Sequence, residues 1–202
     1  MDQKTKPSPR LKPLPVDHTP ELKDIMEGAK KHMGFVPNSM LIMQRKPKLV
    51  KAFAQLGEAV RSDSSIDRTL IALISHVASR TAGCLYCMAH TAERAAKTKP
   101  EKLDAVWEFR TSPLFTEAER VALDFTIAAA SVPNGVTDEM FAELRKHYSE
   151  DQIVDIVAVI SLFGWLNRWN DTMGTPLEDE PLEYGEKYLA PRGWTAGKHA
   201  PR

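Results

Sequence analysis

The chain has 202 residues, of which 43% are hydrophobic and 27% charged, and 27 Lys and Arg balance 27 Asp and Glu. This length allows one sizeable domain or two small ones with ample core, and the composition is ordinary for a globular protein. Zero net charge leaves no basic excess to attract nucleic acid or anionic lipid, so we expect neither as a partner.

The first residues are predicted to form an extended arm. Four of the first fifteen residues are prolines, and the segment is otherwise polar, so we place an arm over residues 1–18 that could lie on a neighbouring subunit. It has no apolar core like that of a secretory signal. The longest apolar run, Ile156–Leu166, is about half the length that spans a bilayer. We therefore expect a cytoplasmic protein without membrane contact.

Apolar residues at helical spacing, interrupted by Gly, Pro and Asn, predict a succession of helices along the chain. The predicted ranges are 19–34, 39–45, 46–61, 66–80, 88–97, 103–110, 120–130, 138–147 and 151–168. Residues that can cap them are Thr19, Ser65 or Asp63, Thr116 with Glu119, Thr137 and Ser149.

No segment shows sustained alternation of apolar and polar residues bounded by turn residues, so the prediction is an all-α fold. We expect a helical domain over residues 19–180. The tail, residues 181–202, is rich in aromatics, Gly and Pro. We expect this tail to be irregular and to pack on the domain or on a neighbouring subunit.

The only two cysteines, Cys84 and Cys87, stand in C-x-x-C spacing at the start of a predicted helix, and His90 follows. Residues three apart on a helix share a face, close enough for a disulfide to form with little backbone movement. Near the helix N-terminus, unpaired N–H groups and the positive end of the dipole favour the thiolate of Cys84. One turn beyond Cys87, His90 could carry a proton to or from either sulfur. The pattern is typical of a redox or peroxidatic dithiol.

Two simpler interpretations remain open. The cysteines could be a buried structural pair, since free cysteine is a common core residue. They could also belong to a zinc site, although only Cys84, Cys87, His90 and His76 could contribute and no second cysteine pair exists. In a reducing compartment, this spacing favours catalysis over a structural disulfide.

The chain resembles the alkyl hydroperoxidase D and carboxymuconolactone decarboxylase superfamily, in its peroxidase-related branch. Three stretches carry the resemblance, which covers roughly residues 20–198: 34–38 (Gly-Phe-Val-Pro-Asn), 70–90 with the cysteine motif, and 162–172. It implies a helical fold that assembles as a homo-oligomer (dimer, trimer or hexamer). It also implies reduction of a hydroperoxide by Cys87 as peroxidatic thiolate and Cys84 as resolving partner, after which a separate dithiol reductant reopens the disulfide.

Two positions depart from the pattern of the best-known members. They carry a glutamate where this chain has Ala72, and they place one more residue between the second cysteine and His90; the shorter spacing occurs in the peroxidase-related branch. His76, one turn after Ala72, is our candidate replacement, unless it is simply a core or surface histidine. Glu93 could orient the imidazole, or be an exposed neighbour. Tyr86 could bind a sulfur or a peroxide oxygen, or only pack beside the site.

The predicted function is a thiol-dependent peroxidase that uses Cys87, Cys84 and His90. No glycine-rich phosphate loop or dinucleotide fingerprint occurs, so we expect no bound cofactor, and we assign no metal. One alternative is a lactone decarboxylase or related proton-transfer enzyme, which needs a base beside a carboxylate pocket rather than a dithiol. Another is a redox-sensing or metal-holding helical oligomer.

Overall fold

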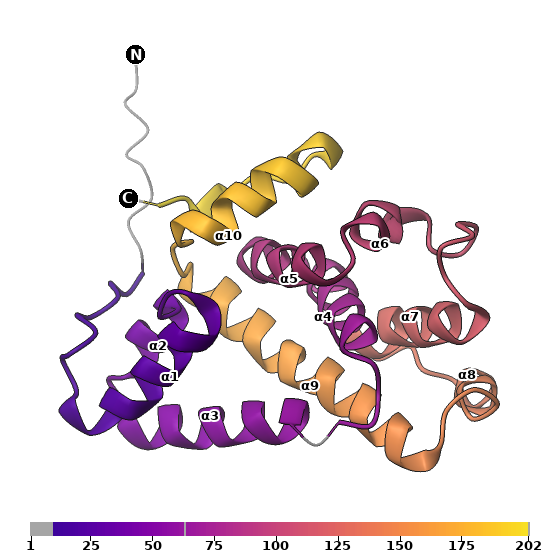
Figure 1. Cartoon of the computed structure of the whole chain (residues 1–202), viewed down its shortest axis with the longest axis horizontal. Helices are drawn as coiled ribbons and strands as arrows, with labels where there is room; N and C mark the ends of the chain where they lie inside the picture. The colour runs from indigo at the N-terminus through magenta and orange to yellow at the C-terminus, as the bar shows by residue number, and fades with distance from the viewer. Residues whose placement is uncertain (1–9, 63, 202) are drawn as a thin grey trace.

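The computed structural model describes residues 10–62 and 64–201, and in these ranges all regular structure is helical (Figure 1). The α-helices are α1 (Lys23–Met33), α2 (Asn38–Met43), α3 (Pro47–Ser62), α4 (Arg68–Thr81), α5 (Leu85–Thr98), α6 (Pro100–Ala105), α7 (Glu117–Ala130), α8 (Asp138–Leu144), α9 (Glu150–Met173) and α10 (Asp179–Tyr184). The predicted all-α fold is confirmed. Within the described ranges, none of the helices combines the length and apolar character needed to cross a bilayer.

Several helix starts follow the predicted capping chemistry. Thr116 and Glu119 form a reciprocal capping box at α7, and the Thr137 and Ser149 side chains accept backbone N–H groups at the starts of α8 and α9. Each cap satisfies a backbone N–H that a helix start otherwise leaves without a partner.

The predicted caps of α4 and the N-terminal helix need correction. The cap of α4 is Asp67, which accepts a hydrogen bond from the Thr69 N–H. Ser65 is instead held on α9, where its N–H and hydroxyl both donate to Asp155 at 2.7 and 2.8 Å, and Asp63 lies outside the described residues. The Thr19 hydroxyl makes no cap and donates to the Gln44 carbonyl at 3.4 Å.

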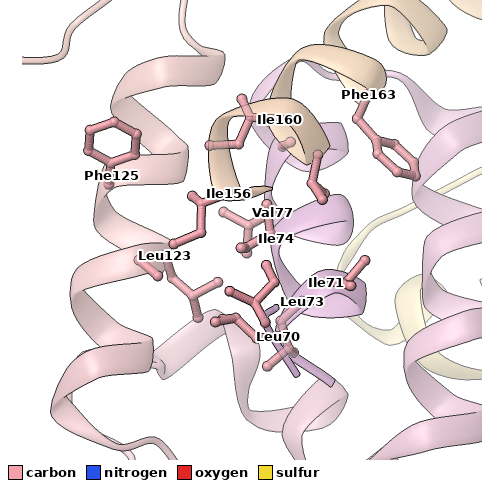
Figure 2. Close-up of a cluster of buried hydrophobic side chains, with 14 of the residues drawn as sticks. Leu70, Ile71, Leu73, Ile74, Val77, Leu123, Phe125, Ile156, Ile160 and Phe163 are labelled. Carbon is pink, nitrogen blue, oxygen red and sulfur yellow. The ribbon is translucent and has the colours of Figure 1, made fainter. Parts of the chain in front are cut away.

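Helix α4 forms the centre of the molecule. Ten consecutive residues, 70–79, are buried because α5, α7 and α9 pack around it (Figure 1). Figure 2 shows Leu73 and Ile74 of α4 among Leu123 of α7 and Ile156 of α9. A segment with no Asp, Glu, Lys or Arg can be enclosed in this way without burying an unpaired charge.

Helix α9 extends a little past residue 168, to Met173, and ends at Gly174, whose φ of +57° is left-handed. The end of this helix carries Asn167 and Asn170 in buried positions, and α9 packs against α4 and α5. The chain then turns back over α5 through residues 175–178 into α10.

The tail is more regular than the sequence suggests. After α10 come a π-helical turn (Gly185–Leu189) and short 3-10 turns at Ala190–Arg192 and Gly197–His199. Leu189 and Trp194 are buried against α5, and the Trp194 indole N–H donates to the Leu85 carbonyl at 3.1 Å. Burial of these apolar side chains outweighs the helix-breaking effect of the glycines and prolines in this segment.

At the other end, the arm residues that the structure describes lie along α2, where the Leu14 N–H donates to the Leu41 carbonyl at 3.2 Å. Residues 1–9 of the predicted arm lie outside the described residues.

Candidate active site

The cysteine pair lies where α4 turns into α5. Gly83 has a φ of +71°, a conformation that favours glycine, and it reverses the chain so that Cys84 becomes the N-cap of α5. The Cys84 sulfur accepts the Cys87 N–H at 3.4 Å. Both cysteines are free thiols in the structure and are buried, with exposed fractions of 0% and 3%. They lie close together without being bonded.

The two sulfurs differ in acidity. The pKa of Cys84 is lowered because the Cys87 thiol and N–H both donate to its sulfur, which outweighs the opposing effect of burial. The pKa of Cys87 is raised well above its usual value by burial and by its donation to Cys84. Cys84 is therefore the more acidic of the two sulfurs, as its place at the helix N-terminus favours.

Cys87 opens onto a cavity of about 810 Å³ between α1, α2, α3, α4, α5 and α9. Apolar side chains cover much of its wall, namely Ile25, Met33, Met40, Phe53, Ile71 and Phe163, and the charged residues Glu58, Arg61, Arg68 and Arg94 line it as well. Tyr86, His90 and Asn170 line it with Cys87, whereas Cys84 does not reach it. A cavity of this volume that combines apolar walls with polar groups suits a small organic ligand.

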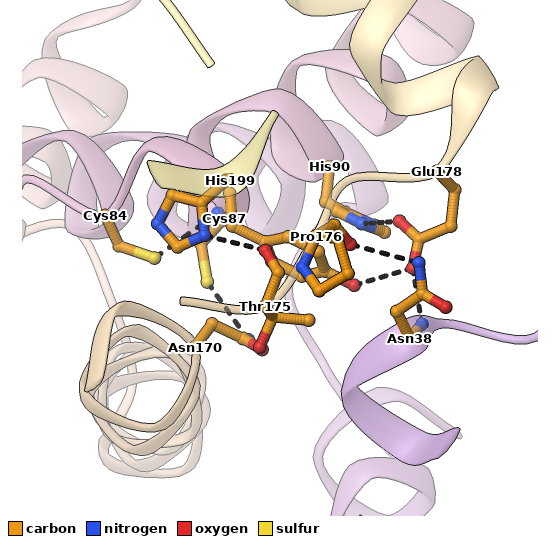
Figure 3. A network of polar contacts seen from close by, with 10 residues as sticks. Asn38, Cys84, Cys87, His90, Asn170, Thr175, Pro176, Glu178 and His199 are labelled. Atoms are coloured by element: carbon orange, nitrogen blue, oxygen red, sulfur yellow. Dashed lines mark hydrogen bonds and ion pairs between the residues drawn. The ribbon is translucent and has the colours of Figure 1, made fainter. Parts of the chain in front are cut away.

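Asn170 of α9 is directed at the Cys87 sulfur, to which its amide nitrogen donates at 3.5 Å (Figure 3). The Thr175 hydroxyl donates to the amide oxygen of Asn170 at 2.9 Å, which fixes which end of the amide faces the sulfur. Asn170 and Thr175 are buried. A fixed donor at this point stabilises a thiolate on Cys87.

His90 is held by Glu178, which lies 88 positions away in the sequence and just before α10 (Figure 3). The His90 Nε2 is 2.7 Å from Glu178 Oε2, while Oε1 accepts the Tyr86 hydroxyl at 2.9 Å and the Asn38 N–H. Burial raises the pKa of Glu178, but the charge of His90 and these hydrogen bonds outweigh it, so the pKa is lowered overall. Glu178 is therefore an anion at neutral pH, and its carboxylate faces the His90 ring.

The other predicted residues are placed differently. Glu93 forms an ion pair with Lys97 at 2.7 Å, so the carboxylate that orients His90 is Glu178 instead. His76 Nδ1 lies 3.0 Å from the Thr91 hydroxyl, and that hydroxyl donates to the Cys87 carbonyl at 2.7 Å. Burial lowers the pKa of His76 to about 4, so the ring is neutral at pH 7 and supports the backbone of Cys87.

Ala72, at the position of the glutamate in the best-known relatives, is buried in the same apolar cluster as Cys84 and Cys87. The site therefore has a methyl group packed beside its cysteines where those relatives carry a carboxylate.

A second set of polar side chains lies around the Cys84 sulfur. Asp171 from the end of α9 and His199 from the last 3-10 turn bring an oxygen and a nitrogen to the Cys84 sulfur, and the three atoms lie within 4.8 Å of one another. Within residues 10–62 and 64–201, these three residues form the group that could hold a metal ion, and of the four ligands considered from the sequence it includes only Cys84.

Glu178 and His199 did not emerge as site residues from the sequence, because each is a single polar residue far from the cysteine motif, with no periodicity or spacing that would link it to that motif. Asn170 and Asp171 lie in the stretch 162–172 that carries the family resemblance. They belong to a polar cluster at the end of the apolar helix, for which the sequence allows either a salt bridge or subunit contact, or binding of a carboxylate or peroxide.

Known proteins share sequence and fold with this chain. The model of the carboxymuconolactone decarboxylase family matches residues 47–128, which include the cysteine motif. The uncharacterised protein YnjA of Escherichia coli K12 is 30% identical over 125 residues, 61% of this chain and 69% of YnjA.

Solved structures extend the likeness to most of the chain. A cysteine-to-alanine variant of the debrominase Bmp8, in complex with 2,3,4-tribromopyrrole, is 34% identical with a TM-score of 0.83 over 88% of this chain and 96% of that one. An uncharacterised peroxidase-related protein from Ralstonia eutropha JMP134, described as an alkylhydroperoxidase AhpD core, is 21% identical with a TM-score of 0.72, over 95% of this chain and 98% of its own. At that identity, the second structure supports the fold alone.

Proposed function

The chain belongs to the alkyl hydroperoxidase D and carboxymuconolactone decarboxylase superfamily, and on that basis we propose that it is a thiol-dependent peroxidase. Its substrate is a small organic hydroperoxide, and the reaction converts the Cys84–Cys87 dithiol into a disulfide. A separate dithiol reductant then restores the thiols, and the chain works as a homo-oligomer.

One observation carries the proposal: a single sulfur, Cys87, reaches an apolar cavity while a second sulfur lies directly behind it. A peroxide in the cavity can meet only Cys87. The oxidised product is then within reach of Cys84, which closes the disulfide before further oxidation.

The proposed cycle begins with a proton transfer between the two sulfurs. Cys84, the more acidic of the two, reacts in its thiolate form and takes the proton of Cys87, and the Cys87 sulfur attacks the nearer peroxide oxygen. The O–O bond breaks, Cys87 becomes a sulfenic acid, and the departing alkoxide takes a proton from His90 and leaves as the alcohol. The Asn170 amide stabilises the thiolate while it forms.

The second step uses the proton that Cys84 has taken up. The Cys84 sulfur attacks the sulfenic sulfur of Cys87, the S–O bond breaks, and the hydroxyl leaves with the Cys84 proton as water. Two electrons pass from the sulfurs to the peroxide, giving one disulfide, one alcohol and one water. His90 regains its proton from solvent through the Glu178 ion pair.

The test is a thiol titration of the reduced protein before and after one equivalent of cumene hydroperoxide, with mass spectrometry of the peptide that holds both cysteines. We expect loss of both thiols and a mass decrease of about 2 Da. The Cys84→Ser variant should react more slowly, because it lacks the sulfur that takes the Cys87 proton, and should stop at a sulfenic acid that dimedone traps. Cys87→Ser should lose peroxide consumption. Full activity in Cys87→Ser would refute the proposal. Activity that survives alkylation of both cysteines would point to the proton-transfer alternative.

Similarity to the debrominase Bmp8 favours a second candidate, reductive dehalogenation of a brominated pyrrole. The same dithiol balances this reaction: one sulfur takes the bromine, the ring carbon takes a proton, and the second sulfur displaces bromide to form the disulfide. Bromide release from 2,3,4-tribromopyrrole, matched to thiol loss, would establish it. If both thiols are lost with 2,3,4-tribromopyrrole but not with cumene hydroperoxide, the same titration would assign the dithiol to dehalogenation.

A further inference from the structure

The Cys84 sulfur has surroundings that the peroxidase mechanism does not use. Asp171 at the end of α9 and His199 near the C-terminus lie beside it, away from the cavity that Cys87 lines. We propose that Cys84, Asp171 and His199 form a binding site for a divalent ion of the zinc class, and that the bound ion masks the dithiol. The masking, but not the binding, rests on the proposed function.

The spacing of the donor atoms suits an ion better than a hydrogen bond. His199 Nε2 and Asp171 Oδ1 are 3.7 Å apart, too far for a hydrogen bond between them. Two ligands at about 2.0–2.3 Å from a tetrahedral ion are separated by about 3.3–3.6 Å. The Cys84 sulfur lies within 4.8 Å of both. Small side-chain movements would bring all three to bonding distance.

The histidine is oriented as metal-binding histidines are. His199 is fully buried, and its Nδ1 donates to the Thr175 carbonyl at 2.7 Å (Figure 3). That hydrogen bond places the proton on Nδ1 and leaves the lone pair of Nε2 free, with no hydrogen-bond partner in the described part of the chain. Metal-ligating histidines characteristically donate their other ring N–H to a carbonyl or carboxylate.

The neighbouring groups also hold the other donors. The Lys198 ammonium is 2.8 Å from Asp171 Oδ2, leaving Oδ1 on the side of His199. The Leu177 N–H donates to the His199 carbonyl at 2.8 Å, which fixes the last turn against the chain that follows α9. The site is therefore built from three separate segments and supported by contacts around each ligand.

The donor set selects the class of ion. Thiolate and imidazole favour zinc and related borderline-soft ions, whereas calcium and magnesium prefer oxygen ligands. A divalent ion can be bound by the Cys84 sulfur, the Asp171 carboxylate and the His199 imidazole together, because their donor atoms lie within 4.8 Å of one another. Three protein ligands leave a fourth position for water.

An ion on Cys84 would remove the sulfur that accepts the Cys87 proton and later closes the disulfide. The metal-bound protein should therefore resist oxidation, and release of the ion should restore the dithiol. The C-terminal turn would in this way connect metal availability to the redox state of the pair.

Binding is tested by titrating Co²⁺ into the reduced, metal-free full chain under anaerobic conditions. We expect one ion per chain, a thiolate-to-cobalt charge-transfer band, and the intense visible absorption of tetrahedral cobalt, all displaced by Zn²⁺. The His199→Asn variant keeps a donor for the Thr175 carbonyl but loses Nε2, and should weaken binding at least about 100-fold. Asp171→Asn, at a half-buried position, checks the site without disturbing the core.

Cys87→Ser is the matched control, because Cys87 is not among the three ligands. It should bind Co²⁺ as the native chain does. Absence of the charge-transfer band, or unchanged affinity in both His199→Asn and Asp171→Asn, would overturn the site. The site would also be overturned if Cys87→Ser lost Co²⁺ binding while the other two variants kept it, because the ion would then lie on the C-x-x-C pair.

Masking has a separate readout, the rate of thiol loss with cumene hydroperoxide in the presence and absence of one equivalent of Zn²⁺. We expect Zn²⁺ to slow thiol loss in the native chain but not in His199→Asn. Equal rates with and without Zn²⁺ in the native chain would refute the masking. If the metal-free chain fails to react with peroxide while cobalt still binds, the peroxidase proposal fails and the metal site stands.

Discussion

The ion pair between His90 and Glu178 offers the sharpest test of the proposed proton donor. Glu178→Gln keeps the shape of the side chain, and its carbonyl oxygen can still accept the Asn38 N–H and the Tyr86 hydroxyl. The amide nitrogen then faces His90 Nε2 in place of Oε2. Because that nitrogen is a donor, it favours a neutral His90 with an unprotonated Nε2, which cannot give that proton to a departing alkoxide.

The size of the expected rate loss follows from the distance between His90 and Glu178. Unit charges 2.7 Å apart attract by about 6 kcal/mol at an effective dielectric constant of about 20. Removal of both groups from water cancels much of this, and charged hydrogen bonds contribute a net ~1.5–3 kcal/mol. At about 1.4 kcal/mol for each factor of ten, thiol oxidation by cumene hydroperoxide should slow about 10- to 150-fold in Glu178→Gln.

The assay is stopped-flow measurement of thiol loss at pH 7, with urea unfolding to show that the variant is folded. Glu180→Gln is the matched control, because Glu180 pairs with Lys97 at 2.7 Å on the surface and is not a hydrogen-bond partner of His90. This control should react within about twofold of the native rate. A folded Glu178→Gln variant with more than half the native rate would refute the role of the ion pair.

Three further predictions concern stability. Tyr86→Phe should cost about 1–2 kcal/mol in urea unfolding, because Glu178 loses one buried donor; an unchanged midpoint would contradict this. Leu73→Ala in the core should lower the free energy of unfolding by about 2–5 kcal/mol, whereas Val154→Ala at an exposed position should change it by no more than about 0.5 kcal/mol. Similar losses for both variants would refute the assigned core. The buried His76 has its pKa lowered to about 4 from 6.5, so the unfolded chain takes up the proton first. The contribution of His76 to the free energy of unfolding, roughly 3 kcal/mol, is present above pH 6.5 and lost as the pH falls to 4. In urea unfolding at pH 7 and 4.5, His76→Asn should therefore lose less stability between the two pH values than the native chain. An equal loss in both proteins would contradict this.

The features that the sequence predicted well are those with a local cause. Helix periods and caps such as Thr116 act within one turn, and the C-x-x-C pair at a helix start needs only Gly83 and the following N–H groups. The tail was predicted to be irregular because its glycines and prolines lower helix propensity, whereas burial of Leu189 and Trp194 decides its structure. Such burial depends on contacts with α5 that no local pattern encodes.

Glu178 and His199 were beyond prediction for the same reason, and the partners of the two sulfurs show how the site is divided. The segment after α9 supplies Glu178 to the His90 side and, near its end, His199 to the Cys84 side. Thr175 connects the two halves, because its hydroxyl orients Asn170 toward Cys87 while its carbonyl fixes the ring of His199.

The two cysteines therefore share a helix start but have different polar neighbours. Cys87 faces the cavity with Asn170 and lies beside His90, as a sulfur that meets substrate requires. Cys84 faces Asp171 and His199, groups that can bind an ion but do not line the cavity. One residue of the segment after α9, Thr175, therefore orients a neighbour of each sulfur, Asn170 beside Cys87 and His199 beside Cys84.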